Sequence, residues 1–196
     1  MIEDNAAQKM AERFIQVTSE LKIESDRGVV IVAVAWIEDD LTRLLKAFLL
    51  PTLRIREKED ELFGIQGCLG MFSAKIDLAY RLGLIREKIC RSLHLCRRIR
   101  NEFAHQFSQV QFEQQSVKDR VLELFRLNEN MIDAIWEESK TVIPKDMIEA
   151  FPNEIISSRA LLSLIGARSL FEILAGTICS GLLLTIDEVK PIQPLE

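Results

Sequence analysis

Residues 85–105 read IREKICRSLHLCRRIRNEFAH, and this stretch decides the fold class of the chain. Apolar side chains recur in it at steps of four, four, three, three and four residues, which is the spacing of one face of an α-helix. They are Ile85, Ile89, Leu93, Cys96, Ile99 and Phe103. The stretch therefore predicts an amphipathic helix with one buried stripe and a polar opposite face.

Helical spacing continues on both sides of this stretch. It predicts helices over 5–22, 27–50, 74–82 (with Ser73 as N-cap), 86–105, 116–136 and 157–186, and a loop with a short helix over 51–71. The run VVIVAV at 29–34 favours a strand by local propensity alone, but its unbroken apolar continuation to Phe48 favours one long buried helix that Pro51 ends. We expect an all-α fold, a helical bundle of about six to seven helices with little or no sheet.

The length of 196 residues suits a single domain spanning 1–196. Within it we expect a core over 5–136 that contains the motif segment 64–105, a polar connecting segment over 137–156, and a C-terminal apolar helix over 157–186. The apolar run 173–186 is shorter than the roughly 20 residues that a bilayer requires. Glu172 and Arg168 precede it and can pair on one helix face. This helix is predicted to lie in the core or at a dimer interface, not in a membrane.

Composition excludes several classes of protein. The formal net charge of -5 and the pI of about 5.3 make direct DNA binding doubtful. The four cysteines form no CxxC pair and there are two histidines, so no structural zinc site has its usual spacing, and we expect neither metal nor cofactor. The acidic N-terminus lacks the pattern of a signal peptide, which predicts a cytoplasmic protein with reduced thiols.

The polar face of the 86–105 helix is the one candidate site. Six of the 25 basic residues and both histidines lie on this helix, which holds only two acids. Arg97, Arg98 and His94 are therefore candidate anion-binding residues. Arg100 projects about 40° from the centre of the apolar stripe, where it must find a carboxylate or backbone oxygens or lie at a subunit interface. Candidate partners for Arg100 are Glu38, Asp39, Asp40 and Asp77.

Two interpretations of the helix end remain open. In the first, Arg100, Asn101 and His105 form a catalytic phosphodiester site: the histidine moves a proton, the arginine holds the phosphate, and the asparagine orients the imidazole. In the second, Arg100 pairs with a core acid, and Asn101 and His105 cap the helix. A straight helix separates Arg100 from His105 by about 140°, so a shared phosphate requires the helix to end near Phe103 or a second chain to complete the cleft.

The pattern Arg-Asn-x-x-x-His at 100–105 resembles the Arg-x4-His motif of the HEPN superfamily, which implies metal-independent ribonuclease activity. The longer run 64–105 resembles the mannitol operon repressor family. It carries a Gly-rich loop (Gly67-Cys68-Leu69-Gly70), then Phe72-Ser73-Ala74-Lys75-Ile76, then 79–85, and ends in Ile99-Arg100-Asn101-Glu102-Phe103-Ala104-His105. That resemblance implies an all-α transcription regulator without a recognisable helix-turn-helix. Phe107 stands where some HEPN toxins carry a modifiable tyrosine.

Our first functional interpretation is a cytoplasmic regulator that resembles mannitol operon repressors and acts through protein contacts. It is expected to form a homodimer with residues 94–105 near the two-fold axis. The second is a HEPN-type ribonuclease with RNA as substrate, and the third is a plain helical interaction module. The sequence names no operon, RNA or protein partner.

Overall fold

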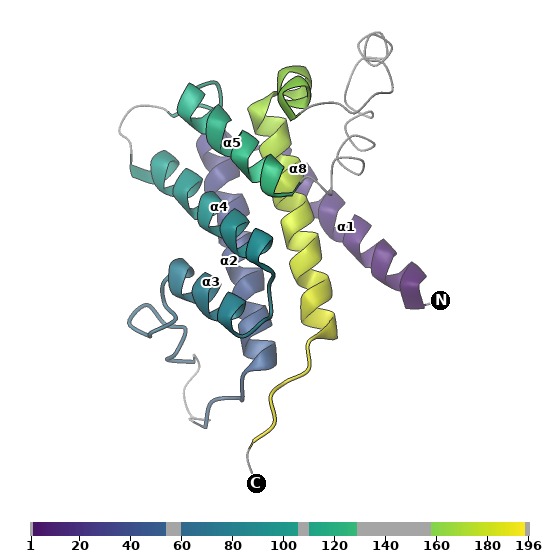
Figure 1. Ribbon diagram of the computed structural model, residues 1–196, viewed down its shortest axis with the longest axis vertical. Coiled ribbons are helices and arrows are strands. Elements are labelled where there is room, and N and C mark those ends of the chain that lie inside the picture. The colour runs from purple at the N-terminus through teal and green to yellow at the C-terminus, as the bar shows by residue number, and fades with distance from the viewer. Residues whose placement is uncertain (1, 54–59, 106–109, 129–157, 195–196) are drawn as a thin grey trace.

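The computed structural model describes residues 2–53, 60–105, 110–128 and 158–194. These ranges contain helices and no strand, so the predicted all-α fold is confirmed for the described part of the chain. The helices pack as a bundle, with α3, α4 and α5 on one side of α2 and α8 (Figure 1). Their bounds are α1 Ile2–Lys22, α2 Asp26–Phe48, α3 Phe72–Arg81, α4 Glu87–His105, α5 Gln115–Leu127 and α8 Ser158–Glu188.

Helix α2 forms as one long helix that includes the run 29–34. Ser25 is its N-cap, and the Ser25 hydroxyl oxygen accepts a hydrogen bond from the Gly28 amide at 3.1 Å. Val29, Val30 and Val34 are completely buried, so core packing overrides the strand preference of the β-branched side chains.

Helix α3 begins two residues earlier than predicted. Met71 occupies the N-cap position with an extended backbone, and Ser73 lies inside the helix, so the predicted Ser73 cap is wrong. The reason is packing: Phe72 is buried in the core and belongs to the first turn. At the other end Gly83 has φ of 74°, and the Leu84 amide donates to the Ala79 carbonyl, which together make a glycine C-cap.

The Gly-rich loop before α3 is built from turns, and the described residues 51–53 and 60–71 contain no short helix. A Cβ added at Gly67 would lie 2.1 Å from the Glu61 carbonyl oxygen, and one at Gly70 would lie 2.4 Å from the Gly64 carbonyl oxygen. These close backbone contacts explain why glycine is needed at both positions.

Helix α8 packs against α1, α2 and α5. Gly166, with φ of 80° and ψ of 161°, kinks it, a feature that the periodicity did not predict. Phe14 and Thr18 of α1 lie about 3.0 Å from where a Gly176 Cβ would stand, so this glycine allows the two helices to approach closely. Nine apolar side chains of α8 are buried in the core: Leu161, Ala167, Leu170, Phe171, Leu174, Ala175, Ile178, Cys179 and Leu182.

By length and composition, residues Arg159–Glu188 are the one described helix able to cross a membrane. More than half of its apolar window is buried inside the bundle, as in the core helix of a soluble protein. The predicted pair forms, because the Arg168 guanidinium donates to Glu172 at 2.9 Å. The same guanidinium also donates to Asp26 at 2.9 Å and to the Glu24 carbonyl at 2.5 Å, which ties α8 to the α1–α2 connection.

Helix α5 ends at Leu127 with Asn128 as its C-cap, whereas the sequence predicted one helix over 116–136. The buried Asn128 amide donates to the Leu124 carbonyl at 2.7 Å and to the Ser92 hydroxyl of α4 at 2.9 Å. A polar residue on the apolar stripe therefore closes one helix and joins it to the next. Residues 129–136 and the predicted connecting segment 137–156 lie outside the described residues.

Candidate functional site

The inner face of α4 carries the predicted stripe. Leu93, Cys96, Ile99 and Phe103 are completely buried, and Ile89 packs on the core edge. This face lies against α2 and α5, and α3 packs beside it. The opposite face of α4 is therefore presented to solvent, as the sequence predicted.

Arg100 finds one of its four candidate partners. Its Nη1 lies 3.4 Å from the Glu38 carboxylate of α2, and its Nη2 donates to the Asn101 side-chain oxygen at 3.3 Å. The guanidinium also lies over the Phe72 ring, 6.0 Å from its centroid. Its side chain is 30% exposed. Arg100 thus packs between α2 and α3 and is only partly solvated.

Glu38 holds two cations from two helices. Its other carboxylate oxygen accepts a hydrogen bond from Lys75 of α3 at 2.8 Å, and the Lys75 side chain is only 9% exposed. One α2 carboxylate therefore fixes both α3 and α4. Our sequence analysis missed Lys75, although its place on the buried face of a short amphipathic helix was a usable signal.

His105 is the exposed last residue of α4, so the described helix extends two residues beyond Phe103. In the described structure the backbone of His105 is still helical, and its side chain does not turn back toward Arg100. Within one chain, Arg100 faces α2 and α3, whereas His105 faces solvent about 140° around the helix. The described structure does not bring Arg100 and His105 together.

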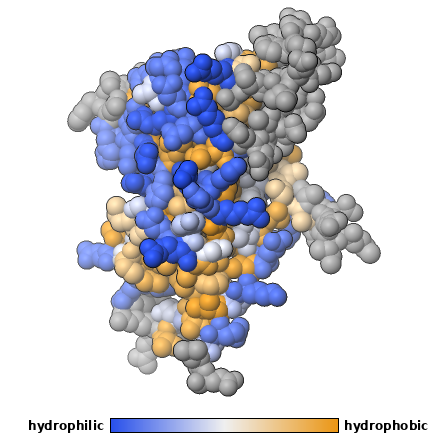
Figure 2. Space-filling model, viewed as in Figure 1, coloured by the Kyte–Doolittle hydropathy of each residue, from blue (hydrophilic) through white to orange (hydrophobic). Residues whose placement is uncertain are grey.

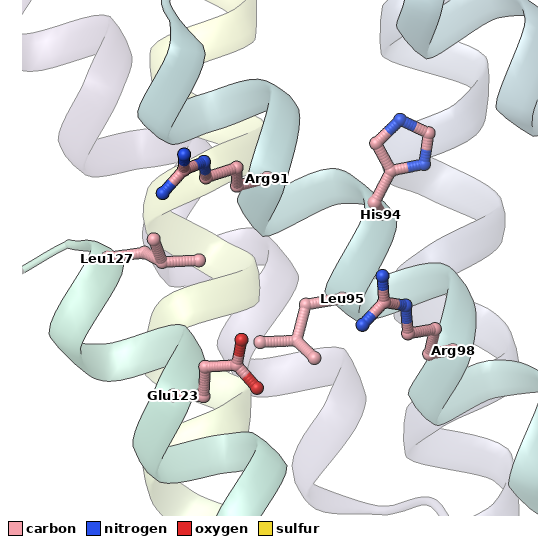
Figure 3. A pocket seen from close by; sticks show the side chains of 6 residues that line it. All are labelled: Arg91, His94, Leu95, Arg98, Glu123 and Leu127. Atoms are coloured by element: carbon pink, nitrogen blue, oxygen red, sulfur yellow. The ribbon is translucent and has the colours of Figure 1, made fainter.

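A pocket of about 310 Å³ lies between the outer face of α4 and α5 (Figure 3). Three of its lining residues are basic or histidine, and a single carboxylate faces them across the pocket. The lining residues are Arg91, His94, Leu95, Arg98, Glu123 and Leu127. The pocket is lined by two of the three predicted anion-binding residues, His94 and Arg98. It is also lined by Arg91, which the sequence did not single out from the other basic residues of the helix.

Arg97, the third predicted anion-binding residue, is not among the lining residues. It is partly buried, and its Nε has no hydrogen-bond partner within the described ranges. Arg97 lies about 100° around the helix axis from Arg98, which turns it away from the pocket.

The two helices that form the pocket are joined by charge as well as by packing. The α4 carboxylate of Glu102 accepts a hydrogen bond from the Ser116 hydroxyl at 2.9 Å and forms an ion pair with Arg120 of α5. The only other acid of α4, Glu87, pairs with Arg91 at 2.7 Å on an exposed surface. Hydrophilic side chains gather over α4 and α5 on the face shown in Figure 2.

His94 also contacts α3. Its Nε2 lies 2.9 Å from an Asp77 carboxylate oxygen, and its side chain is 25% exposed. The Cys90 sulfur lies one helical turn before His94 on the same side of α4. Burial, with the neighbouring carboxylates of Asp77 and Glu87, raises the pKa of the Cys90 thiol.

No protein-family model and no curated protein matches the chain. Its fold is similar to that of a chain in the X-ray structure of the MtlR–HPr complex from Escherichia coli, with a TM-score of 0.53 and 17% identity. The similarity covers 89% of this chain and 98% of that one. A likeness at this identity shows a shared fold, which agrees with the resemblance of residues 64–105 to mannitol operon repressors.

Proposed function

We propose that this chain is a cytoplasmic regulatory protein that acts by binding another protein. The observation that carries the proposal is the fold similarity over nearly the whole of both chains to a structure solved as a protein–protein complex. The resemblance of residues 64–105 to mannitol operon repressors supports the same class. The structural neighbour names HPr as the first partner to test.

The surface that suits such a partner is the α4–α5 pocket. Arg98 is exposed there, and Arg91 pairs with Glu87 through an exposed ion pair of the kind that contributes at most about 1 kcal/mol. A partner carboxylate can therefore replace Glu87 at little cost. In a chain of net charge -5, this local basic surface favours a protein with an acidic patch and steers its approach.

The ribonuclease interpretation draws on the same helix but receives less support. It needs Arg100 free to hold a phosphate, whereas Arg100 contacts Glu38 and Asn101 and lies over Phe72. It also needs a second chain to supply the missing half of the cleft. The pairing of Arg100 favours the structural role that the sequence left open.

Homodimerisation is part of the proposal, but contacts within one chain account for both of the sequence features that suggested it. The two reasons for expecting a dimer were a buried Arg100 in need of a partner and an apolar helix over 160–186. Within one chain, Glu38 pairs with Arg100, and α1, α2 and α5 cover much of α8. The dimer therefore stays a prediction for solution measurement.

Isothermal titration calorimetry of the full chain with the HPr of its own organism tests the proposal. We expect saturable binding that weakens as salt is raised, because charged contacts are screened. The double variant Arg91→Glu/Arg98→Glu should weaken binding by about tenfold or more. The matched control Lys118→Glu/Lys190→Glu makes the same change of charge elsewhere, on α5 and after α8, and should bind like the wild type.

Two results would contradict the proposal in different ways. Absence of binding by the wild type would reject HPr recognition, and with it the partner that the fold similarity names. Equal weakening by both double variants would keep a binding function but reject the α4–α5 pocket as its surface, since the effect would then come from total charge alone.

A further inference from the structure

Three side chains with different donor atoms meet between α3 and α4. Asp77 comes from α3, and Cys90 and His94 come from successive turns of α4, four residues apart on one face. One carboxylate oxygen, the thiol sulfur and one imidazole nitrogen all lie within 4.8 Å of one another. The His94 Nε2 and an Asp77 oxygen are already 2.9 Å apart.

We propose that Asp77, Cys90 and His94 bind a divalent ion of the zinc class, with the remaining coordination position open to water. A set of one thiolate, one imidazole and one carboxylate suits zinc, whereas calcium and magnesium prefer oxygen donors alone. Three protein ligands with one open position is the arrangement found in zinc sites that exchange a ligand. This inference is independent of the function proposed above.

The helices hold these ligands in place before any metal binds. Cys90 and His94 belong to a continuous helix, and a glycine C-cap at Gly83 fixes the end of α3 three residues after Tyr80. The α2 carboxylate of Glu38 binds a cation from each of the two helices that carry the ligands. Contacts outside the site thus set the distance between α3 and α4. Metal binding therefore spends little free energy on ordering the ligands.

The partial exposure of the ligands allows an ion to enter. Asp77 is 63% exposed and His94 is 25% exposed, while Cys90 is partly buried at the base of the group. Binding would release the thiol proton of Cys90 to solvent and replace the Asp77–His94 hydrogen bond by two bonds to the ion.

The cysteine and histidine spacings of this chain match no four-ligand structural zinc site, which is why no metal was expected from the sequence. The three ligands found here are separated by 13 and 4 residues and come from two helices, a pattern that no short motif describes. Only the packing of α3 on α4 brings Asp77 to the other two. A search by short motifs therefore does not find this group, although the residue types are present.

Metal analysis of tag-free protein tests the site, since a polyhistidine tag would itself bind zinc. After EDTA treatment, zinc loading and desalting, we expect about one zinc ion per chain. With cobalt(II) as probe, a thiolate-to-cobalt charge-transfer band should appear in the near ultraviolet. The Cys90→Ser variant should lose that band, whereas Cys68→Ser, which changes an exposed cysteine of the Gly-rich loop, should keep it.

A second variant guards against misfolding of the first. Asp77→Asn changes an exposed side chain and should keep the helical circular dichroism of the wild type while weakening zinc binding by about tenfold or more. The proposal is overturned if the wild type retains no zinc, if the cobalt band survives in Cys90→Ser, or if Asp77→Asn binds zinc like the wild type.

Discussion

Removing the negative charge of Glu38 should destabilise the whole bundle. Glu38→Gln leaves the Lys75 ammonium, 9% exposed, without its carboxylate and also removes the partner of Arg100. Breaking a fully buried ion pair costs about 3–5 kcal/mol and an exposed one at most about 1 kcal/mol. Glu38 is 22% exposed and glutamine still accepts a hydrogen bond, so we expect a loss of about 2 kcal/mol.

For a chain of this size, that loss lowers the thermal midpoint by about 4–8 °C. Asp39→Asn is the matched control, because Asp39 is the next residue along the helix and is an exposed acid. The Asp39→Asn variant should melt within about 1 °C of the wild type. The effect of Glu38→Gln should also shrink in a Lys75→Met background, since the pair is then absent. If Glu38→Gln and Asp39→Asn melt together, Glu38 does not tie α3 and α4 to α2 and the reasoning is wrong.

Other measurements test the remaining parts of the account. Arg100→Ala should lower the melting temperature less than Glu38→Gln, because Arg100 is 30% exposed, and the exposed His105→Ala should leave it nearly unchanged; a large drop for His105→Ala alone would contradict this. Incubation with total RNA in EDTA should show no cleavage that His105→Ala abolishes, and such cleavage would instead favour the ribonuclease. Light scattering at micromolar concentration should give twice 22.5 kDa, and a monomeric mass would reject the dimer. Burial raises the pKa of Cys96 and Cys179 to about 12, so above about pH 9 the unfolded state binds fewer protons and the free energy of unfolding should fall; urea melts at rising pH that show no fall would contradict this.

Local and periodic features of the fold were predictable from the sequence. The stripe from Leu93 to Phe103 follows helical spacing, and the serine cap of α2 and the glycine after α3 occupy positions that their chemistry favours. The angle of Arg100 to the stripe also indicated that it needs a carboxylate, backbone oxygens or an interface, and Glu38 was one of four acids named. Apart from the choice of Glu38, which lies on another helix, these inferences depend on neighbours within a few turns of the same helix.

Features that depend on packing between helices were not predictable. Glu38 meets Lys75 across 37 residues of sequence, and Asp77 meets His94 across 17. Nothing in either local sequence indicates which helix will lie opposite. The kink at Gly166 was not predicted for a different reason. An isolated glycine is tolerated within a helix, and the apolar spacing continues past this one.

Hydrogen exchange read by mass spectrometry, with and without HPr, tests the central claim most directly. If the chain is a regulator that binds its partner at the α4–α5 pocket, HPr should slow exchange of the backbone amides in 88–98 of α4 and 120–127 of α5. Peptides from α1, on the far side of α8, should exchange at unchanged rates (Figure 1). Unchanged exchange in α4 and α5 at saturating HPr would contradict the account.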